Sequence, residues 1–495
     1  MARGIRQGPL AGRYPAVAAM VIFALLPYLA LSAALQPLVP LISRDLHMSG
    51  QTMSLSSGMA NAAYAVGTVL AVQFSQLLPQ RRMLVLYALL LVVGSVLALA
   101  AQDAATFIAG RVLQGLATSL MLIAAVPPLA LGFGLTKLRE TATIMSMGIF
   151  GAVAAGPTIG GIQAEENGWR PLFAVVAGIA LVAFLLSLLT FEDAPPADPS
   201  APRDPLAIGL AAAGSAAAFF GASELSSHAF FSAQAFGPLV GGLALIVVLS
   251  VYQFRASRPL LTVRTMFSST IPVAGIVVAL FAAAASVSAI DLTANLLADE
   301  HGPLRIGLLF LPELGGAVLT AVLLGRLLPR RGIHYLPLVG MLFLAAGIGI
   351  FRIELPPSQA LTVVGSAVTG IGLGATVAPA LFVAGLSLGA GNLQRVFAIV
   401  ELYRAVAAFM IAPIFAHFAV GRYGTGVAMW VGLGLALGGA AVAVLLYALG
   451  RARPQTPELE RFMAGEGPAW YSPPLLAALR TRSVPAEPAA EGTRA

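Results

Sequence analysis

Five charged residues lie inside long apolar stretches of this sequence, where a charge is costly to keep. They are Arg111, Asp291, Glu313, Glu401 and Arg404. A charge near the centre of an apolar membrane helix costs roughly 3 kcal/mol or more, so such residues usually face a partner or a polar cavity. An embedded carboxylate can bind and release a proton, and an embedded guanidinium can hold an anion. We therefore treat these residues as candidates for proton coupling or for lining a substrate cavity.

Arg111 begins the segment Arg111-Val112-Leu113-Gln114-Gly115, about two helical turns into its apolar stretch. Gln114 follows three positions later, so both side chains would share one helical face and one polar lining. Gly115 would let a neighbouring helix approach closely. The competing interpretation is an arginine that extends to the outer membrane interface, and we favour the cavity.

The carboxylates differ in their local partners. Glu313 lies about nine residues into its stretch with no basic residue one turn away, so it is our first candidate for a proton or a cationic group. Glu401 and Arg404 are three positions apart. They either neutralise each other or act in binding, and both interpretations stay open. Asp291 lies nearer the end of its stretch, where we expect a solvated position.

A further stretch carries Gly156-Pro157 and Gly160-Gly161. Glycines four residues apart form a face on which helices pack backbone to backbone. Pro157 frees a backbone carbonyl and allows a bend. The sequence therefore predicts a hinge or packing helix, which is either purely structural or seals the molecule against leakage.

The elements that must position these residues are membrane-spanning helices, each of which needs about 20 mostly apolar residues. Fourteen such stretches lie at approximately 15–41, 52–76, 82–101, 105–131, 142–163, 169–191, 206–224, 236–254, 269–294, 305–326, 335–352, 359–386, 395–419 and 427–449. The predicted fold class is an all-α polytopic membrane protein with 14 transmembrane helices.

Composition supports this class. The 495 residues are 58% hydrophobic and 10% charged, whereas soluble domains carry about 25% charged residues. The chain has no cysteine and only five scattered histidines, so we expect no disulfide, no metal site and no cofactor. Catalysis in a polar loop is disfavoured because the longest connector between stretches is a short, proline-rich one without histidine. The chain is therefore not expected to be an enzyme.

The basic residues predict an orientation. With the N-terminus in the cytoplasm, 21 of the 28 lysines and arginines fall in cytoplasmic segments, as the positive-inside rule requires. The net charge of +7 is then a topology signal, so nucleic acid is not an expected partner. Arg81 and Arg82 would lie in a cytoplasmic loop that could act as a gate. We expect a multi-pass protein of the plasma membrane (the bacterial inner membrane).

Three short similarities recur at offsets of 250 to 255 residues, which indicates an internal duplication. Leu77-Leu78-Pro79 matches Leu327-Leu328-Pro329, and glycine pairs and an Ala-Val-Ala-Ala segment repeat in the same order. The predicted organisation is a cytoplasmic N-terminus (1–14), a six-helix bundle (15–191), a cytoplasmic linker (192–205), an inserted helix pair (206–254), a second six-helix bundle (255–449) and a largely disordered cytoplasmic tail (450–495).

Arg111-x-x-Gln114-Gly115 resembles motif B of the major facilitator superfamily. Gly156-Pro157-x-x-Gly160-Gly161, followed by Trp169-Arg170, resembles its motif C. With fourteen stretches, residues 15–450 are similar to the drug:proton antiporters of the EmrB/QacA type. The resemblance implies two six-helix bundles around a midplane cavity and proton-coupled export of small amphipathic molecules by alternating access. It also implies that Arg111 serves proton coupling, and that the partners are a substrate, protons and the lipid bilayer, with a monomer as the transport unit.

Two positions depart from that family. The loop at 76–82 keeps Arg81 and Arg82 but lacks the acidic residue and both glycines of motif A. Leu31 stands where the family commonly has an aspartate. These departures keep a second hypothesis open, in which the chain carries a lipid or metabolite without coupling to protons. A protein of this fold that has lost transport is disfavoured, because idle buried charges only cost stability.

Overall fold

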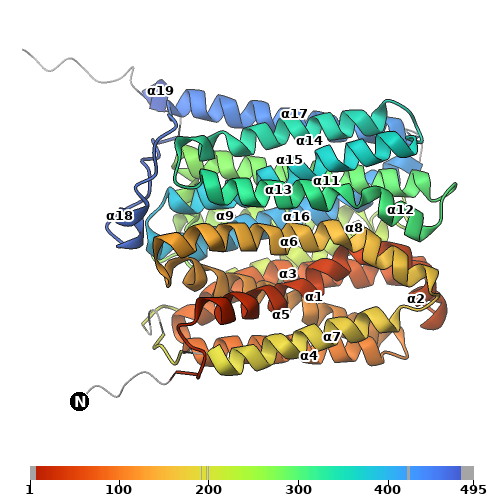
Figure 1. Cartoon of the computed structure of the whole chain (residues 1–495), viewed down its shortest axis with the longest axis horizontal. Helices are drawn as coiled ribbons and strands as arrows, with labels where there is room; N and C mark the ends of the chain where they lie inside the picture. Colours follow the sequence, from red (N-terminus) through yellow and green to blue (C-terminus); the bar gives the residue numbers. More distant parts are fainter. Residues whose placement is uncertain are drawn as a thin grey trace, which may run out of the picture.

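The structure is a computed structural model that describes residues 7–190, 192–196, 198, 200–420, 424–475 and 477–480. Its long helices run side by side in one bundle (Figure 1). The described part of the chain contains no β-sheet, and its β pairing consists of two isolated bridges. The all-α prediction is confirmed.

Thirteen helices are long and apolar enough to span a membrane among the described residues, and a shorter apolar helix of 17 residues, Leu336–Arg352, makes a fourteenth. The helices of the first half are α1 (Tyr14–Ala34), α2 (Val39–Asp45), α3 (Gly50–Leu77), α4 (Gln80–Ala100), α5 (Ala104–Leu131), α6 (Gly134–Glu165) and α7 (Arg170–Thr190). The inserted pair is α8 (Pro205–Glu224) and α9 (Phe236–Arg255). The second half contains α10 (Val263–Phe267), α11 (Thr270–Leu297), α12 (Pro303–Phe310), α13 (Pro312–Leu327), α14 (Leu336–Arg352), α15 (Gln359–Leu386), α16 (Leu393–Val420) and α17 (Gly424–Gly450).

The predicted stretches match these helices with three differences. The stretch 15–41 is divided, because α1 ends at Ala34 and α2 begins at Val39. Helix α6 begins at Gly134, eight residues before the predicted start at 142. Lys137 and Glu140 form an ion pair at 2.6 Å on its first turns, so polar residues extend this helix beyond its apolar part. The predicted stretch 305–326 is divided into α12 and α13 just before Pro312, which has no amide hydrogen to continue the helix.

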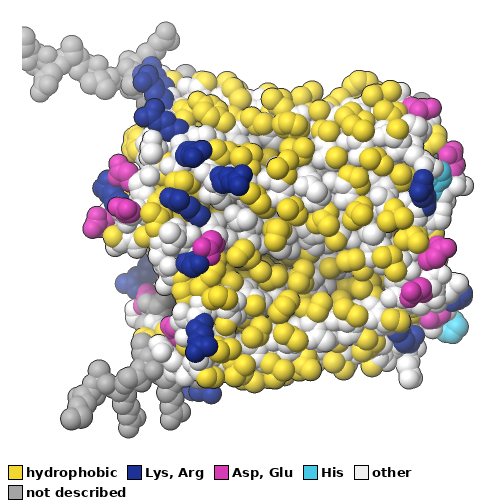
Figure 2. Space-filling view, viewed as in Figure 1, with side chains coloured by type: hydrophobic (Ala, Val, Ile, Leu, Met, Phe, Trp, Pro, Cys, Tyr) yellow, Lys and Arg dark blue, Asp and Glu magenta, His cyan; other side chains and the backbone are white. Residues whose placement is uncertain are grey.

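The bundle has two ends. The tail end carries the N-terminal segment, the linker after α7 and the helices α18 (Leu459–Met463) and α19 (Ala477–Arg480), all at the left of Figure 1. The far end carries α2 and α12. Lysine and arginine side chains gather at the tail end in Figure 2, while hydrophobic side chains cover the flank between the two ends. This is the pattern of a protein whose flank faces lipid.

The inserted pair packs mainly on the first half. Helix α8 lies against α3, and both carboxylate oxygens of Glu224 accept hydrogen bonds from Gln51 at 2.9 Å. The contact with the second half is smaller, and it includes the hydrogen bond between Ser250 and Tyr403 at 2.6 Å. The pair therefore belongs structurally with the first half.

The tail differs from the prediction of disorder across its described part. Residues 459–470 bury Leu459, Phe462 and Trp470. The Ala469 amide donates to Leu386 O at 2.8 Å, at the end of α15, and α18 packs against α6 of the first half. The C-terminal tail therefore contacts both halves at this end of the bundle. Residues 481–495 lie outside the described part.

Candidate functional site

A cluster in the first half surrounds Arg111. Arg111 on α5 is 2% exposed. Its Nη1 donates to Gln114 Oε1 at 3.0 Å, and Gln114 Nε2 donates to Ser95 Oγ on α4 at 3.0 Å. The guanidinium carbon lies 5.3 Å from the ring centroid of Tyr28 on α1, a cation–π arrangement. Arg111 Nε has no hydrogen-bond partner among the described residues, so no carboxylate neutralises this arginine there.

Two stacked tyrosines lead from this cluster toward the second half. The rings of Tyr28 and Tyr64 are 5.6 Å apart and nearly parallel, at 14°. The Tyr28 hydroxyl donates to Asn61. Tyr64 on α3 is 1% exposed, so its hydroxyl needs a partner inside the protein.

That partner is Glu401 on α16. The Tyr64 hydroxyl donates to Glu401 Oε2 at 3.0 Å. Arg404 donates through Nε to both carboxylate oxygens at 3.0 Å and through Nη2 to Oε2 at 2.6 Å. Glu401 and Arg404 therefore neutralise each other, one of the two interpretations from the sequence, and they also contact the first half. Residues 28, 64, 111, 401 and 404 form one chain, which we call the central cluster.

Glu313 lies elsewhere, in the second half, directly after the break between α12 and α13. It is 1% exposed, and its Oε1 has no hydrogen-bond partner among the described residues. Its backbone packs on Gly370 of α15, where an added Cβ would lie 2.7 Å from the Glu313 Cα. Asp291 on α11 is half-buried in the last two turns of the helix and lies close enough to act electrostatically on Glu313. We call these two the acidic pair.

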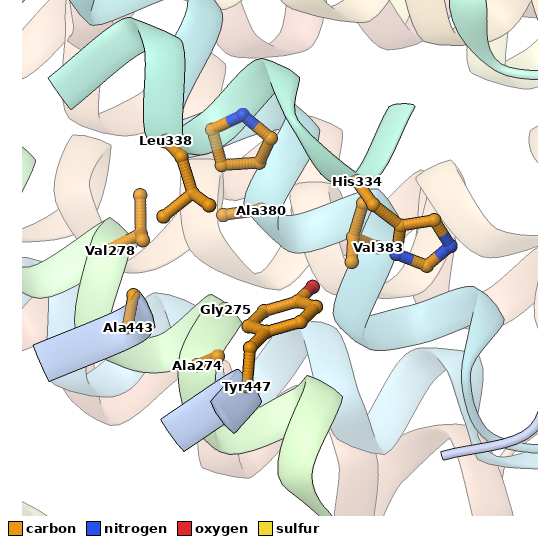
Figure 3. A pocket seen from close by; sticks show the side chains of 10 residues that line it. Ala274, Gly275, Val278, His334, Leu338, Ala380, Val383, Ala443 and Tyr447 are labelled. Carbon is orange, nitrogen blue, oxygen red and sulfur yellow. The ribbon is translucent and has the colours of Figure 1, made fainter. Parts of the chain in front are cut away.

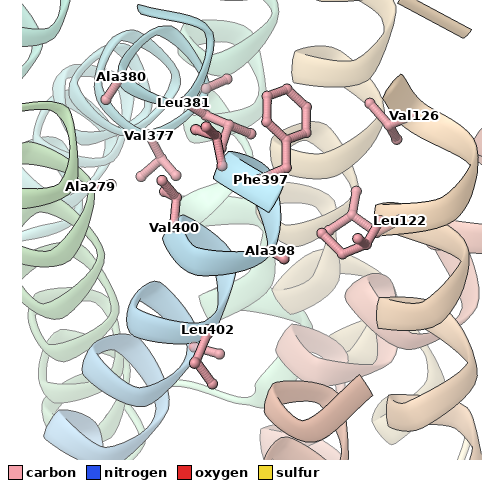
Figure 4. Close-up of a cluster of buried hydrophobic side chains, with 14 of the residues drawn as sticks. Leu122, Val126, Ala279, Val377, Ala380, Leu381, Phe397, Ala398, Val400 and Leu402 are labelled. Atoms are coloured by element: carbon pink, nitrogen blue, oxygen red, sulfur yellow. The ribbon is translucent and has the colours of Figure 1, made fainter. Parts of the chain in front are cut away.

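The space between the halves is narrow. Apolar side chains from α5 and α6 face others from α15 and α16 across it, and Glu401 is on its wall. Figure 4 shows part of this lining, with Leu122 and Val126 opposite Leu381 and Phe397. The space would hold about one water molecule. A larger molecule does not fit into this space in the structure.

Both ends of this space are closed. At the far end, Gln36 Nε2 donates to Asn295 Oδ1 of the second half at 2.8 Å. At the tail end, the Ser75 hydroxyl on α3 donates to Gln394 Oε1 on α16 at 2.9 Å. The two halves therefore contact each other at both ends of the bundle.

At the far end, the glycines of α6 allow neighbouring backbone to pack closely against this helix. Gly156 and Gly160 lie against the end of α1, where a Cβ on Gly156 would be 3.0 Å from Ala34 N. Gly161 instead faces the second half, where a Cβ would be 2.5 Å from Pro303 O. Thr158, next to Pro157, donates to Gly307 O at 2.7 Å. Gly115 plays a similar part inside the first half, with a Cβ 3.3 Å from Tyr28 Cε2 and closer still to the Ala60 carbonyl.

Two other features lie away from the central cluster. Arg81 and Arg82 stand in the first turn of α4 at the tail end, and not in the loop where the sequence predicted them. A second small pocket, shown in Figure 3, lies within the second half between α11, α14, α15 and α17, with His334 and Tyr447 among its lining residues. The described residues contain no group of three or more potential metal ligands.

Sequence reasoning found the charged residues but gave Tyr28 and Tyr64 no specific part. Their signal was a hydroxyl inside an apolar stretch, which needs a hydrogen-bond partner when buried. The pairing of Tyr64 with Glu401, 337 positions apart, has no local pattern in the sequence.

Comparisons with known proteins address the family directly. A family model described as Major Facilitator Superfamily matches residues 21–292. "Multidrug resistance protein B homolog" of Mycobacterium tuberculosis is 25% identical over 67% of this chain and 61% of its own length. "Drug efflux pump JefA" of the same organism is 24% identical over 76% and 77%. "Tetracenomycin C resistance and export protein" of Streptomyces glaucescens is 26% identical over 68% and 62%. The chain therefore spans less than two thirds of the first and third of these relatives.

Two solved structures share the fold. The proton:xylose symporter XylE, bound to 6-bromo-6-deoxy-D-glucose, aligns with a TM-score of 0.61 at 13% identity over 87% of this chain and 95% of its own. The human organic anion transporter MFSD10 (TETRAN) aligns with a TM-score of 0.60 at 15% identity over 87% and 99%. The fold and the family match together show that the chain belongs to the major facilitator superfamily.

Proposed function

We propose that this chain is a secondary transporter that exports small amphipathic molecules in exchange for protons. Relatives that cover most of the chain carry names of efflux pumps and resistance proteins. The described residues form two halves around a closed central space, which is the arrangement that alternating access requires. The tail end would face the cytoplasm of a bacterium, because the basic residues gather there.

The observation that carries proton coupling is the acidic pair. Glu313 is enclosed at a helix break with an unpartnered carboxylate oxygen, and its charged neighbour is another carboxylate. An ionised carboxylate enclosed within a membrane span is costly unless it has a partner or a function. A group that is neutral when enclosed and ionised when open to water can carry a proton across the membrane. Interrupted helices at membrane depth are also typical of transporter binding sites.

The test is proton movement in proteoliposomes that enclose a pH-sensitive dye. We would compare the wild type with Glu313→Gln and Arg111→Ala on a panel of amphipathic molecules that includes lipophilic cations. Glu300→Gln, an exposed acid at the far end, is the matched control. We expect substrate-evoked proton flux in the wild type and in the control, and its loss in Glu313→Gln.

A second candidate function is an uncoupled carrier of a lipid or metabolite. It is favoured by Leu31 on α1 and by the lack of a carboxylate partner for Arg111 among the described residues. Substrate transport that proceeds without any proton signal would replace the antiporter proposal with this one.

A further inference from the structure

Glu401 lines the central space and accepts hydrogen bonds from residues of both halves. Its carboxylate accepts hydrogen bonds from Arg404 on its own helix and one from Tyr64 of the first half. A carboxylate has about four acceptor positions, so the Tyr64 hydroxyl fills the place that faces the first half. Glu401 also lines the space between the halves.

Tyr64 occupies its place as a small aromatic molecule would. Its ring stacks on Tyr28 and meets the edge of Phe409 at 6.5 Å and 84°. The aromatic edge of Phe409 and the hydroxyl contact to Glu401 both come from α16 of the second half. The second half therefore provides an edge contact and one strong acceptor for a hydroxylated ring.

Opening of the halves must break the contact between Tyr64 and Glu401, because α3 and α16 belong to different halves. Arg404 lies on the same helix as Glu401 and moves with it, so the ion pair survives the opening. What becomes free is one acceptor position on Glu401, beside apolar walls. A buried acceptor that loses its donor costs about 1–3 kcal/mol or more when charged, so a ligand that supplies a donor is favoured there.

The net charge of the central cluster favours a neutral hydrogen-bond donor over a cationic one. Glu401 and Arg404 sum to zero, and Arg111 on the other side of Tyr28 adds one positive charge, so the central cluster carries a net charge of +1. Charges act more strongly in a site that excludes water than in bulk solvent. A cationic ligand is therefore disfavoured at this position, while a neutral hydroxyl is accepted.

We propose that the substrate at this position is a neutral aromatic molecule with a hydroxyl group, a phenol, which takes the place of the Tyr64 side chain on Glu401. Tyr64 is the internal occupant that keeps the site filled when the halves are closed. This inference rests on the proposed transport function and specifies one substrate class for it.

The probes are 2-naphthol and its methyl ether, 2-methoxynaphthalene, which has the same ring system but no hydrogen-bond donor. Equilibrium binding to the purified full chain in lipid nanodiscs measures both. In the wild type we expect 2-naphthol to bind about tenfold more tightly than the ether, since a hydrogen bond to a charged acceptor distinguishes the two.

Two substitutions and one control locate the effect. Tyr64→Phe removes the competing hydroxyl and keeps the ring, so 2-naphthol should bind about tenfold more tightly than to the wild type, with the ether unchanged. Glu401→Gln should reduce the preference for 2-naphthol, because a neutral amide oxygen is a weaker acceptor than a carboxylate. Tyr87→Phe is the matched control, because Tyr87 is also 1% exposed but its hydroxyl has no partner among the described residues. It should change neither affinity.

Equal binding of the two probes to the wild type, absence of binding, or a Tyr64→Phe variant that binds 2-naphthol no better would overturn the inference. The proton-flux measurement on the wider panel is independent of it. Flux evoked by other molecules without a preference for 2-naphthol would leave the transport function standing and remove only the phenol site. A preference for 2-naphthol without any proton flux would leave the phenol site standing and remove the proton coupling.

Discussion

His334 connects a single titratable side chain with the position of the tail. It is 1% exposed, neither ring nitrogen has a hydrogen-bond partner among the described residues, and its ring meets Trp470 at 4.7 Å. Burial lowers the pKa of His334 from 6.5 to about 4. The neutral ring is therefore the form that the docked tail accommodates.

The tail should undock as the pH falls. If undocking exposes His334, its pKa returns toward 6.5, so the undocked form binds more protons between about pH 6.5 and pH 4. Docking is then fully stable above pH 6.5 and weakens as the pH falls through this window. We expect the fluorescence of Trp470, isolated by subtracting a Trp470→Phe variant, to shift to longer wavelength there. A His334→Phe variant should show no shift, and an identical shift in that variant would exclude His334 as the cause.

The sequence predicts contacts between residues of one helix better than contacts between residues of different helices. The contact of Arg111 with Gln114 and the ion pair of Glu401 with Arg404 follow from a spacing of three on a helix. Asp291 shows the limit, because nothing in the sequence indicates that it lies close enough to act electrostatically on Glu313 of another helix. Such contacts depend on helix packing, which a single sequence does not specify.

At the scale of the helices, two adjacent glycines of α6 contact different halves of the molecule. Substitutions can therefore test the two contacts separately. A Cβ on Gly161 would be 2.5 Å from Pro303 O of α12, so Gly161→Ala should keep the far end from closing. We expect the cross-linking of cysteines at positions 36 and 295 to fall several-fold. Gly160→Ala strains the first half alone, which overpacking makes about 1–3 kcal/mol less stable, so it should lower the melting temperature without a comparable loss of cross-linking.

Gly315→Ala on α13 is the control for both changes, because no atom lies within 4 Å of its added Cβ. It should alter neither measurement. Unchanged cross-linking in Gly161→Ala would show that α12 shifts to accommodate the methyl group, and that this glycine is not needed to seal the far end.

The apolar stretches predict the helices because backbone groups inside a membrane must be paired within each span. Other features of the helices and of the tail cannot be predicted from hydropathy alone. Polar residues such as Lys137 extend α6 past the apolar part of its sequence, and Pro312 divides a stretch that hydropathy alone joins. In the tail, Phe462 and Trp470 are separate apolar residues in a polar segment, and only the packed bundle gives them a surface to cover.

For the whole molecule, the internal repeat predicts two halves, and the structure adds which contacts join them. The hydrogen bond of Gln36 with Asn295 closes the far end, and that of Ser75 with Gln394 closes the tail end. Neither pair could be read from the repeat, because a similarity between the halves does not say which of their residues touch. These two contacts make the proposed alternation of access testable.

Alternating access requires each of these closures to open in turn. In this cysteine-free chain, cysteines placed at 36 and 295, or at 75 and 394, can be joined by a short bifunctional thiol reagent that a reductant removes. Either cross-link should stop transport, because a carrier held shut at one end can still bind substrate from the other side but cannot release it across the membrane. Reductant should restore activity.

A cross-link between cysteines at 51 and 224 should leave transport intact, because both positions move together as parts of the first half and its inserted pair. If transport continues with either end held shut, substrate passes by a route that does not require the halves to separate there, and the rocking mechanism must be abandoned.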